Sequence, residues 1–164
     1  MNTGQSLFAI GALLILSLTV LRFNNNILQT DNIMLDSKST ILAVSLATSL
    51  IEEANRKAFD AASAENAVVD VADLTDAYSL GPGWWETRET YNDFDDFNGF
   101  TETITNLPAA IFNISCEVSY VSPDNPDGKV NYKTWHKKLT VTVDSPSMEN
   151  PVILSTIYSY WNFR

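Results

Sequence analysis

The sequence predicts an α+β protein in which a long N-terminal α-helix, hydrophobic in its first half, packs on a small antiparallel β-sheet. An uncharged apolar run covers residues 6–21, and a helical pattern of apolar residues follows as far as Asp60. Beyond residue 111, apolar and polar residues alternate as they do in half-buried strands. The apolar face of such a sheet must be covered, and the C-terminal half of the long helix is the available partner.

Composition limits the classes of protein to which the chain can belong. A formal net charge of −10 argues against binding to nucleic acid or to anionic membrane surfaces, because like charges repel. The chain is 45% hydrophobic, which is enough for one core. The single cysteine, Cys116, excludes an internal disulfide and any metal site built from several cysteines.

Residues 1–23 are predicted to form a hydrophobic helix that lies in a membrane or in the core of a filament. Between residues 7 and 21 only Gly11, Ser17 and Thr19 are not clearly apolar, and roughly 17–25 residues span a bilayer. A cleaved secretory signal is the alternative. No lysine or arginine precedes the run and no Ala-x-Ala site follows it, so the sequence favours a retained helix.

Residues 24–60 are predicted to continue this helix as an amphipathic one. Two neighbouring stripes are apolar: Leu35, Leu42, Leu46, Leu50 and Ala54 on one, and Met34, Ile41, Val44, Thr48 and Ile51 on the other. Either the helix is enclosed within its own domain, or its own domain buries one side and neighbouring subunits bury the other. The attached apolar segment favours assembly. A continuous helix from Gln5 to Asp60 would be about 80 Å long, although the asparagine-rich patch at residues 24–32 could be unwound.

Residues 61–164 are predicted to form a β-rich globular head. A linker, a short strand or helical turn at residues 68–74, and an aromatic and acidic loop at residues 81–100 come first. Three strands of an antiparallel meander then follow, at residues 112–120, 139–143 and 152–161, with turns at 123–128 and 145–151.

Three stretches, in the same order, resemble the minor pilins of the type V and MSHA kinds, which are type IV pilin-like proteins. They are AVSLATSLIEEANRKAFD at residues 43–60, NDFDDFNGF at residues 92–100, and KKLTVTVDSP with NPVILSTIYSYW at residues 137–161. The resemblance implies a pilin-like lollipop, anchored in the inner membrane by its N-terminal helix before assembly. It also implies that an inner-membrane assembly machine polymerises the chain into an extracellular filament, whose structural subunit it would be.

The same resemblance implies which residues make contacts between subunits. Pilins carry a glutamate at the fifth mature position, where either Gln5 or Ala9 stands here, depending on where the chain is processed. Gln5 could hydrogen-bond the amino terminus of a neighbour without charge pairing. The predicted assembly residues are Gln5, Phe8, Ala12, Leu16, Leu35, Leu42, Leu46 and Leu50.

Few residues suggest chemistry, and no enzyme or cofactor is expected. Asp93, Asp95 and Asp96 could ligate calcium, but the spacing of an EF-hand fails and an acidic surface turn is the preferred interpretation. Asn113 begins an Asn-Ile-Ser glycosylation sequon. Cys116 is expected to be a buried, inert thiol and His136 a surface side chain.

A second functional class competes with the filament subunit. The chain could be a monomeric, membrane-anchored binding module, periplasmic or surface-exposed, that holds a ligand with its aromatic and acidic loop. The apolar belt at residues 41–51 discriminates between the two classes, because a lone anchor should expose polar residues there.

Overall fold

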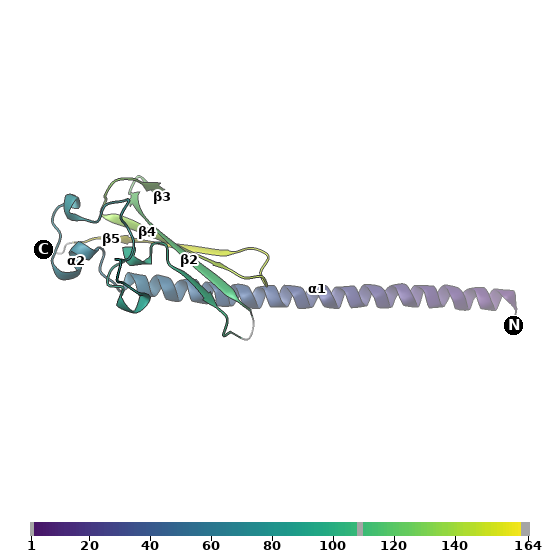
Figure 1. The fold of residues 1–164 in the computed structure, drawn as a ribbon. Coiled ribbons are helices and arrows are strands. Elements are labelled where there is room, and N and C mark those ends of the chain that lie inside the picture. The colour runs from purple at the N-terminus through teal and green to yellow at the C-terminus, as the bar shows by residue number, and fades with distance from the viewer. Residues whose placement is uncertain (1, 108–109, 162–164) are drawn as a thin grey trace.

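The computed structural model, which describes residues 2–107 and 110–161, confirms the predicted α+β class (Figure 1). Met1 and the last three residues of the predicted head lie outside the described residues. The helices are α1 (Thr3–Asn55) and α2 (Ala61–Glu65), with 3-10 turns η1 (Val71–Asp73), η2 (Arg88–Thr90) and η3 (Asp95–Phe97). The strands are β1 (Thr101–Ile104), β2 (Phe112–Ser122), β3 (Asn125–Val130), β4 (His136–Asp144) and β5 (Val152–Ser159).

Helix α1 runs without a break for 53 residues and projects far beyond the head (Figure 1). Its asparagine-rich patch stays helical, because no proline occurs before Pro82 and each poor helix former costs only a fraction of a kcal/mol. The helix ends at Asn55, five residues before the predicted Asp60. Asp60 instead caps the N-terminus of α2, where its carboxylate accepts the backbone N–H of Ala62 and Ser63 completes a capping box.

The sheet has five antiparallel strands in the order β1-β2-β4-β5, with β3 paired to β2. Strand β2 is the centre: β4 lies along one of its edges, while β1 and β3 share the other. Strands β2, β4 and β5 are the predicted meander. Two strands were not predicted from the sequence: β1, which is only four residues long, and β3, whose Pro126 and Gly128 resemble a turn.

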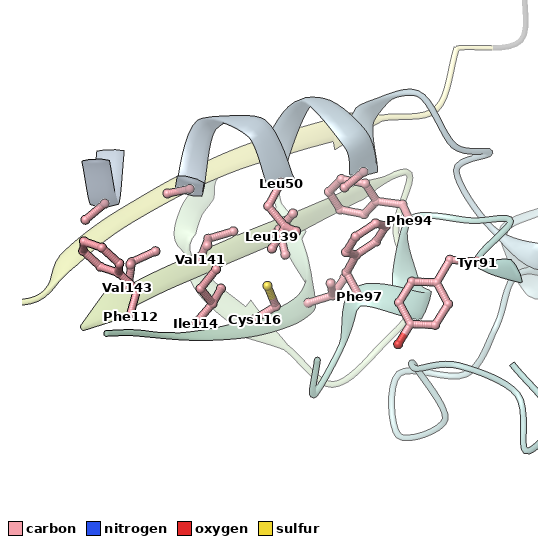
Figure 2. Packing of buried hydrophobic residues seen from close by; sticks show 14 residues of the cluster. Leu50, Tyr91, Phe94, Phe97, Phe112, Ile114, Cys116, Leu139, Val141 and Val143 are labelled. Atoms are coloured by element: carbon pink, nitrogen blue, oxygen red, sulfur yellow. The ribbon is translucent and has the colours of Figure 1, made fainter. Parts of the chain in front are cut away.

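A stripe of small residues on α1 makes the contact with the sheet. The residues of α1 that are buried are Ser39, Ala43, Ala47, Leu50 and Ala54. The side of α1 that faces the sheet is therefore rotated from the predicted leucine stripe to the small residues beside it. Leu42, Leu46 and Ile51 flank the contact and are half-buried, because small side chains let the helix axis approach the sheet. Figure 2 shows Leu50 pointing from the helix toward Leu139, with Val141 and Cys116 beneath it.

Aromatic residues of the η3 loop close one end of this core. Phe94 and Phe97 are fully buried, and the Tyr91 ring meets the Phe97 ring edge-on at 5.3 Å between centroids (Figure 2). A second, smaller cluster of Phe59, Val68, Leu74 and Tyr120 lies beside the main core. The predicted short element at residues 68–74 contains the 3-10 turn η1, and Val68 and Leu74 on either side of this turn belong to the cluster.

We expect the head to fold without the first 23 residues. The buried residues of α1 begin at Ser39, so a chain starting at Asn24 keeps the whole helix–sheet contact and loses only exposed apolar surface. It should be soluble, rich in β-structure by circular dichroism, and cooperative in thermal unfolding. A chain starting at Leu50 is the matched control: it lacks Ala43 and Ala47 and should not fold. Aggregation or disorder of the longer chain at low concentration would contradict the helix-on-sheet core.

Candidate functional site

The first candidate site is the N-terminal half of α1, which no other part of the described chain covers. Its large apolar side chains are exposed, with Leu7 at 76% and Phe8 at 85% of their full accessible area. The others are Ile10, Leu13, Leu14, Ile15, Leu16, Leu18, Val20, Leu21, Phe23, Ile27 and Leu28. This helix is long and apolar enough to cross a membrane, and its membrane-length apolar segment is not buried by the head. A surface of this kind is covered by lipid or by protein.

The predicted assembly residues fall into two groups. Gln5, Phe8, Ala12, Leu16 and Leu35 are exposed. Leu42 and Leu46 are half-buried against the core of their own head, and Leu50 is only 3% exposed. Leu50 therefore offers no surface to a neighbouring copy, because the small-residue stripe turns this part of the helix toward its own sheet.

The side of α1 that does not pack on the sheet stays apolar at the edge of the head. Ile41, on the side of α1 away from the buried Ala43 and Ala47, is 69% exposed, and Val44, which flanks them, is 40% exposed. Ile33, Met34 and Leu35 extend this exposed apolar surface toward the N-terminus. Helix α1 is thus covered by its own head on one side only.

The acidic loop is not part of the outer surface, contrary to its preferred interpretation. Asp93, Asp95 and Asp96 are each no more than 3% exposed. The carboxylate of Asp93 accepts the backbone N–H of Asp95 at 2.9 Å and of Asp96 at 3.2 Å, so it caps η3. The carboxylate of Asp96 accepts the backbone N–H of Asn92 at 2.8 Å and of Asp93 at 3.1 Å. The loop folds inward because its own amides satisfy these acids.

A buried lysine supplies the compensating positive charge and forms the second candidate site. Lys137, in β4, has no exposed side-chain area. Its ammonium group donates to Asp60 Oδ2 at 2.6 Å, to the carbonyl oxygen of Phe59 at 2.9 Å, and to Asp95 Oδ1. The rings of Phe59 and Tyr120 lie 4.7 and 5.4 Å from Nζ. Charges this deep in a protein persist only when they are paired and hydrogen-bonded.

Asp60 is the most densely hydrogen-bonded group of this cluster. Besides Lys137 and Ala62, its carboxylate accepts the backbone N–H of Thr75 at 3.2 and 3.0 Å and the Thr75 hydroxyl at 3.1 Å. The Tyr120 hydroxyl donates to Asp60 Oδ2 at 3.4 Å and to the Thr75 carbonyl oxygen at 2.8 Å. Asp60 therefore ties the end of α1, the η1 loop and the centre of the sheet together.

The pKa values of the carboxyl groups diverge across the cluster. Burial opposes ionisation of Asp60, but the charge and hydrogen bond of Lys137, with those from Thr75 and Ala62, outweigh it and lower its pKa. Burial, followed by the charge of Asp95, raises the pKa of Asp93 to about 8. Burial also raises the pKa of Asp96. The cluster therefore holds one strongly ionised carboxylate near one that is protonated at neutral pH.

Sequence reasoning missed Asp60 and Lys137 as a pair, although one signal was present. Lys137 has the same parity as Leu139, Val141 and Val143, so strand alternation alone puts it on the buried face of β4. A lysine in an inward-facing position requires a buried acid, and the neighbouring loop is acidic. The partner Asp60 carries no such signal, because it lies 77 residues away in the sequence.

The remaining predicted residues are separate from both sites. Cys116 is buried, as predicted, and burial raises its thiol pKa to about 12. His136 is half-buried rather than on the surface, and its Nδ1 lies 2.7 Å from the Ser159 hydroxyl. Asn113 is exposed on the outer face of β2 and accepts a hydrogen bond from the Thr103 hydroxyl at 3.0 Å.

The aromatic loop places two tryptophans in solvent. Trp84 and Trp85 are 89% and 86% exposed, so they do not belong to the core. Tyr158 and Tyr160, by contrast, are half-buried and contact the Phe59 ring at 5.8 and 5.5 Å between centroids. The two tryptophans of this loop therefore lie in solvent, whereas its acids are buried.

Comparison with protein-family models, with characterised proteins and with solved structures finds no match to this chain.

We expect the stability of the head to fall as the pH rises from about 5 to about 9. Asp93 has a pKa near 8 in the folded chain and about 3.9 in the unfolded one, so its contribution is full at low pH and is lost as the pH passes 8. The lowered pKa of Asp60 has the opposite effect on stability: its contribution is present above the ordinary pKa of aspartate and is lost only as the pH falls below that value. In Asp93→Asn the side-chain oxygen can still accept from Asp95 and Asp96 but the group no longer ionises, so the variant should be more stable than the parent at about pH 9, by up to about 5 kcal/mol.

Urea unfolding of both chains across this pH range measures the difference. Asp124→Asn, an exposed carboxyl on the β2–β3 turn, is the matched control and should follow the parent. An equal loss of stability with pH in Asp93→Asn and in the parent would contradict the buried, protonated Asp93.

We also expect calcium to leave the thermal stability of the chain unchanged. The three loop carboxylates already accept backbone N–H groups or contact Lys137, and a ligand stabilises only the state that binds it. Among the described residues, no three Asp, Glu, His or Cys side chains are grouped to hold a metal ion. A melting temperature that climbs by many degrees in millimolar calcium, and falls back in Asp95→Asn, would make the loop a metal site.

Proposed function

We propose that this chain is a structural subunit of an extracellular type IV pilus-like filament and that it assembles by packing of its N-terminal helices. The observation that carries the proposal is the one-sided cover of α1. The head buries the Ala43 and Ala47 side of the helix, while Ile41 and the whole N-terminal half stay exposed and apolar.

The amount of apolar surface supports burial by other copies. Moving one leucine or phenylalanine side chain from water to an apolar environment stabilises by about 1.5–3 kcal/mol. The described N-terminal half of α1 exposes many such side chains along its length, on every side of the helix. Parallel helices of neighbouring copies would bury this surface all round, which the single head of one copy does not.

Before assembly, the same segment would lie in the inner membrane. Its apolar part matches the thickness of a bilayer, so lipid can cover it until a neighbouring helix does. The partners are then other copies of the chain and an inner-membrane assembly machine that moves the subunit from lipid into the filament. Neither nucleic acid nor a cofactor has a part in this proposal.

A membrane-anchored monomeric binding module is the second candidate. Trp84 and Trp85, exposed side by side with ring centroids 5.9 Å apart, favour it. The acids of the same loop do not, because Asp93, Asp95 and Asp96 face inward and are already hydrogen-bonded. The exposed Ile41 surface also has no role in a monomer, so the filament subunit is preferred.

Charges placed on the exposed helix should abolish assembly. In Ala12→Glu and Ile41→Lys the new charge would lie unpaired in an interface, which costs several kcal/mol. Ile41 lies outside the membrane-length run and is exposed, so Ile41→Lys should insert in the membrane and fold normally. We expect normal subunit levels in the membrane fraction for Ile41→Lys, but no filaments by negative-stain microscopy of the cell surface.

Gln29→Glu is the matched control, because it adds a charge to the polar patch of the same helix. It should still form filaments. Filaments of normal abundance from both Ala12→Glu and Ile41→Lys would contradict the proposal, and a soluble ligand bound through Trp84 in the absence of filaments would support the binding module.

A further inference from the structure

Lys137 and Asp60 lie in the geometry of an amine and a carboxyl group about to react. Both side chains are fully buried, and Nζ lies 2.6 Å from Asp60 Oδ2. Asp95, itself buried, contacts Nζ as well. The aromatic rings of Phe59 and Tyr120 cover the nitrogen. A lysine held this way between two carboxylates, away from water, has surroundings that promote condensation as well as ion pairing.

We propose that Lys137 and Asp60 condense into an intramolecular isopeptide bond once the head has folded. The ammonium group of Lys137 loses two protons, and a new bond forms between its Nζ and Cγ of Asp60. The bond between Cγ and Oδ2 of Asp60 breaks, and this oxygen leaves with the two protons as one water molecule. Nothing is oxidised or reduced, and the ion pair and the amide with its released water have the same total charge.

The hydrogen bonds around Asp60 select it as the carboxyl group that is attacked. The Thr75 hydroxyl and the backbone N–H of Ala62 both donate to Oδ1 at 3.1 Å, and the backbone N–H of Thr75 is shared between Oδ1 at 3.2 Å and Oδ2 at 3.0 Å. Oδ1 is the oxygen that stays, and it carries the negative charge of the tetrahedral intermediate. Donors fixed in advance around such an oxygen stabilise the transition state of acyl transfer.

Asp95 is placed to move the protons. Its Oδ1 contacts Nζ, so it can take one proton from the ammonium group and pass it to Oδ2 of Asp60, which turns the ionised carboxylate into the neutral acid that the free amine attacks. After the attack Asp95 carries the second proton from the nitrogen to Oδ2, which departs as water. Asp93 accepts the backbone N–H of Asp95 at 2.9 Å, which holds Asp95 in place at the start of η3. We expect Asp95 to act as the catalytic base and then as the acid.

The driving force comes from the removal of buried charge. Keeping an ammonium ion and carboxylates in a dry interior is costly even when they are paired, whereas an amide is neutral and retains hydrogen-bonding atoms. The bond would join Asp60, just after the end of α1, to β4 in the middle of the sheet. It would close a loop between residues 77 positions apart, which restricts the unfolded chain as a disulfide does.

Mass spectrometry of the detergent-solubilised full chain tests the proposal without any variant. Trypsin cuts after Arg88 and Lys129, so Asp60 and Asp95 fall on different peptides, residues 58–88 and 89–129. We expect peptide 58–88 to be joined to peptide 134–138, uncut at Lys137, with a mass one water below the sum of the two. A join to peptide 89–129 would place the bond at Asp95 and overturn the assignment, and unjoined peptides with Lys137 free would overturn the proposal itself.

Two variants separate the chemistry from the fold. Lys137→Arg keeps the positive charge but cannot form this amide, and Asp95→Asn removes the proton carrier while keeping the shape of the side chain. Both should give unjoined peptides 58–88 and a lower melting temperature, while circular dichroism still shows a folded head. A joined peptide 58–88 in a folded Asp95→Asn chain would overturn the role of Asp95. The proposal does not depend on filament formation, because the bond forms within one head.

Discussion

The close contact between the small-residue stripe of α1 and the sheet is the constraint on which the other parts of the molecule depend. Ser39, Ala43 and Ala47 bring the helix so near the sheet that larger neighbours must lie to the sides. Each strand that faces the helix therefore supplies the bulk of the core, through residues such as Leu139 and Val141. The same contact turns Ile41 outward, so the covered side and the exposed side of α1 follow from one choice of small residues.

The buried charge cluster has a different physical character from the apolar core beside it. Apolar packing tolerates exchanges of similar volume, whereas a cluster of one ammonium group and several carboxylates is stable only with every partner in place. Asp60, Asp95 and Lys137 come from three separate stretches of the chain and meet only in the complete head. The cluster therefore couples the end of α1 to the η3 loop and to β4, whether the groups remain ions or become an amide.

Local periodicity explains which parts of the fold could be predicted. The long helix, its apolar first half, the strands β2, β4 and β5, and the buried Cys116 all follow from patterns within a few residues of each other. The rotated stripe could not be found this way, because hydrophobicity ranks Leu46 above Ala47 although sheet proximity favours Ala47. The acids at residues 93–96 resemble a surface turn until Lys137 is placed opposite, and that contact is made by tertiary structure alone.

The placement of the tryptophans determines what intrinsic fluorescence can report. Trp84, Trp85 and Trp161 are at least 74% exposed, so they are already surrounded by water in the folded chain. Trp135 is half-buried and stacks on the Tyr160 ring at 5.4 Å. Its indole is therefore the one of the four whose emission should shift to longer wavelength when the head opens. Emission from the other three tryptophans changes little on unfolding, so the total fluorescence of the protein should shift only slightly when the head loses its structure.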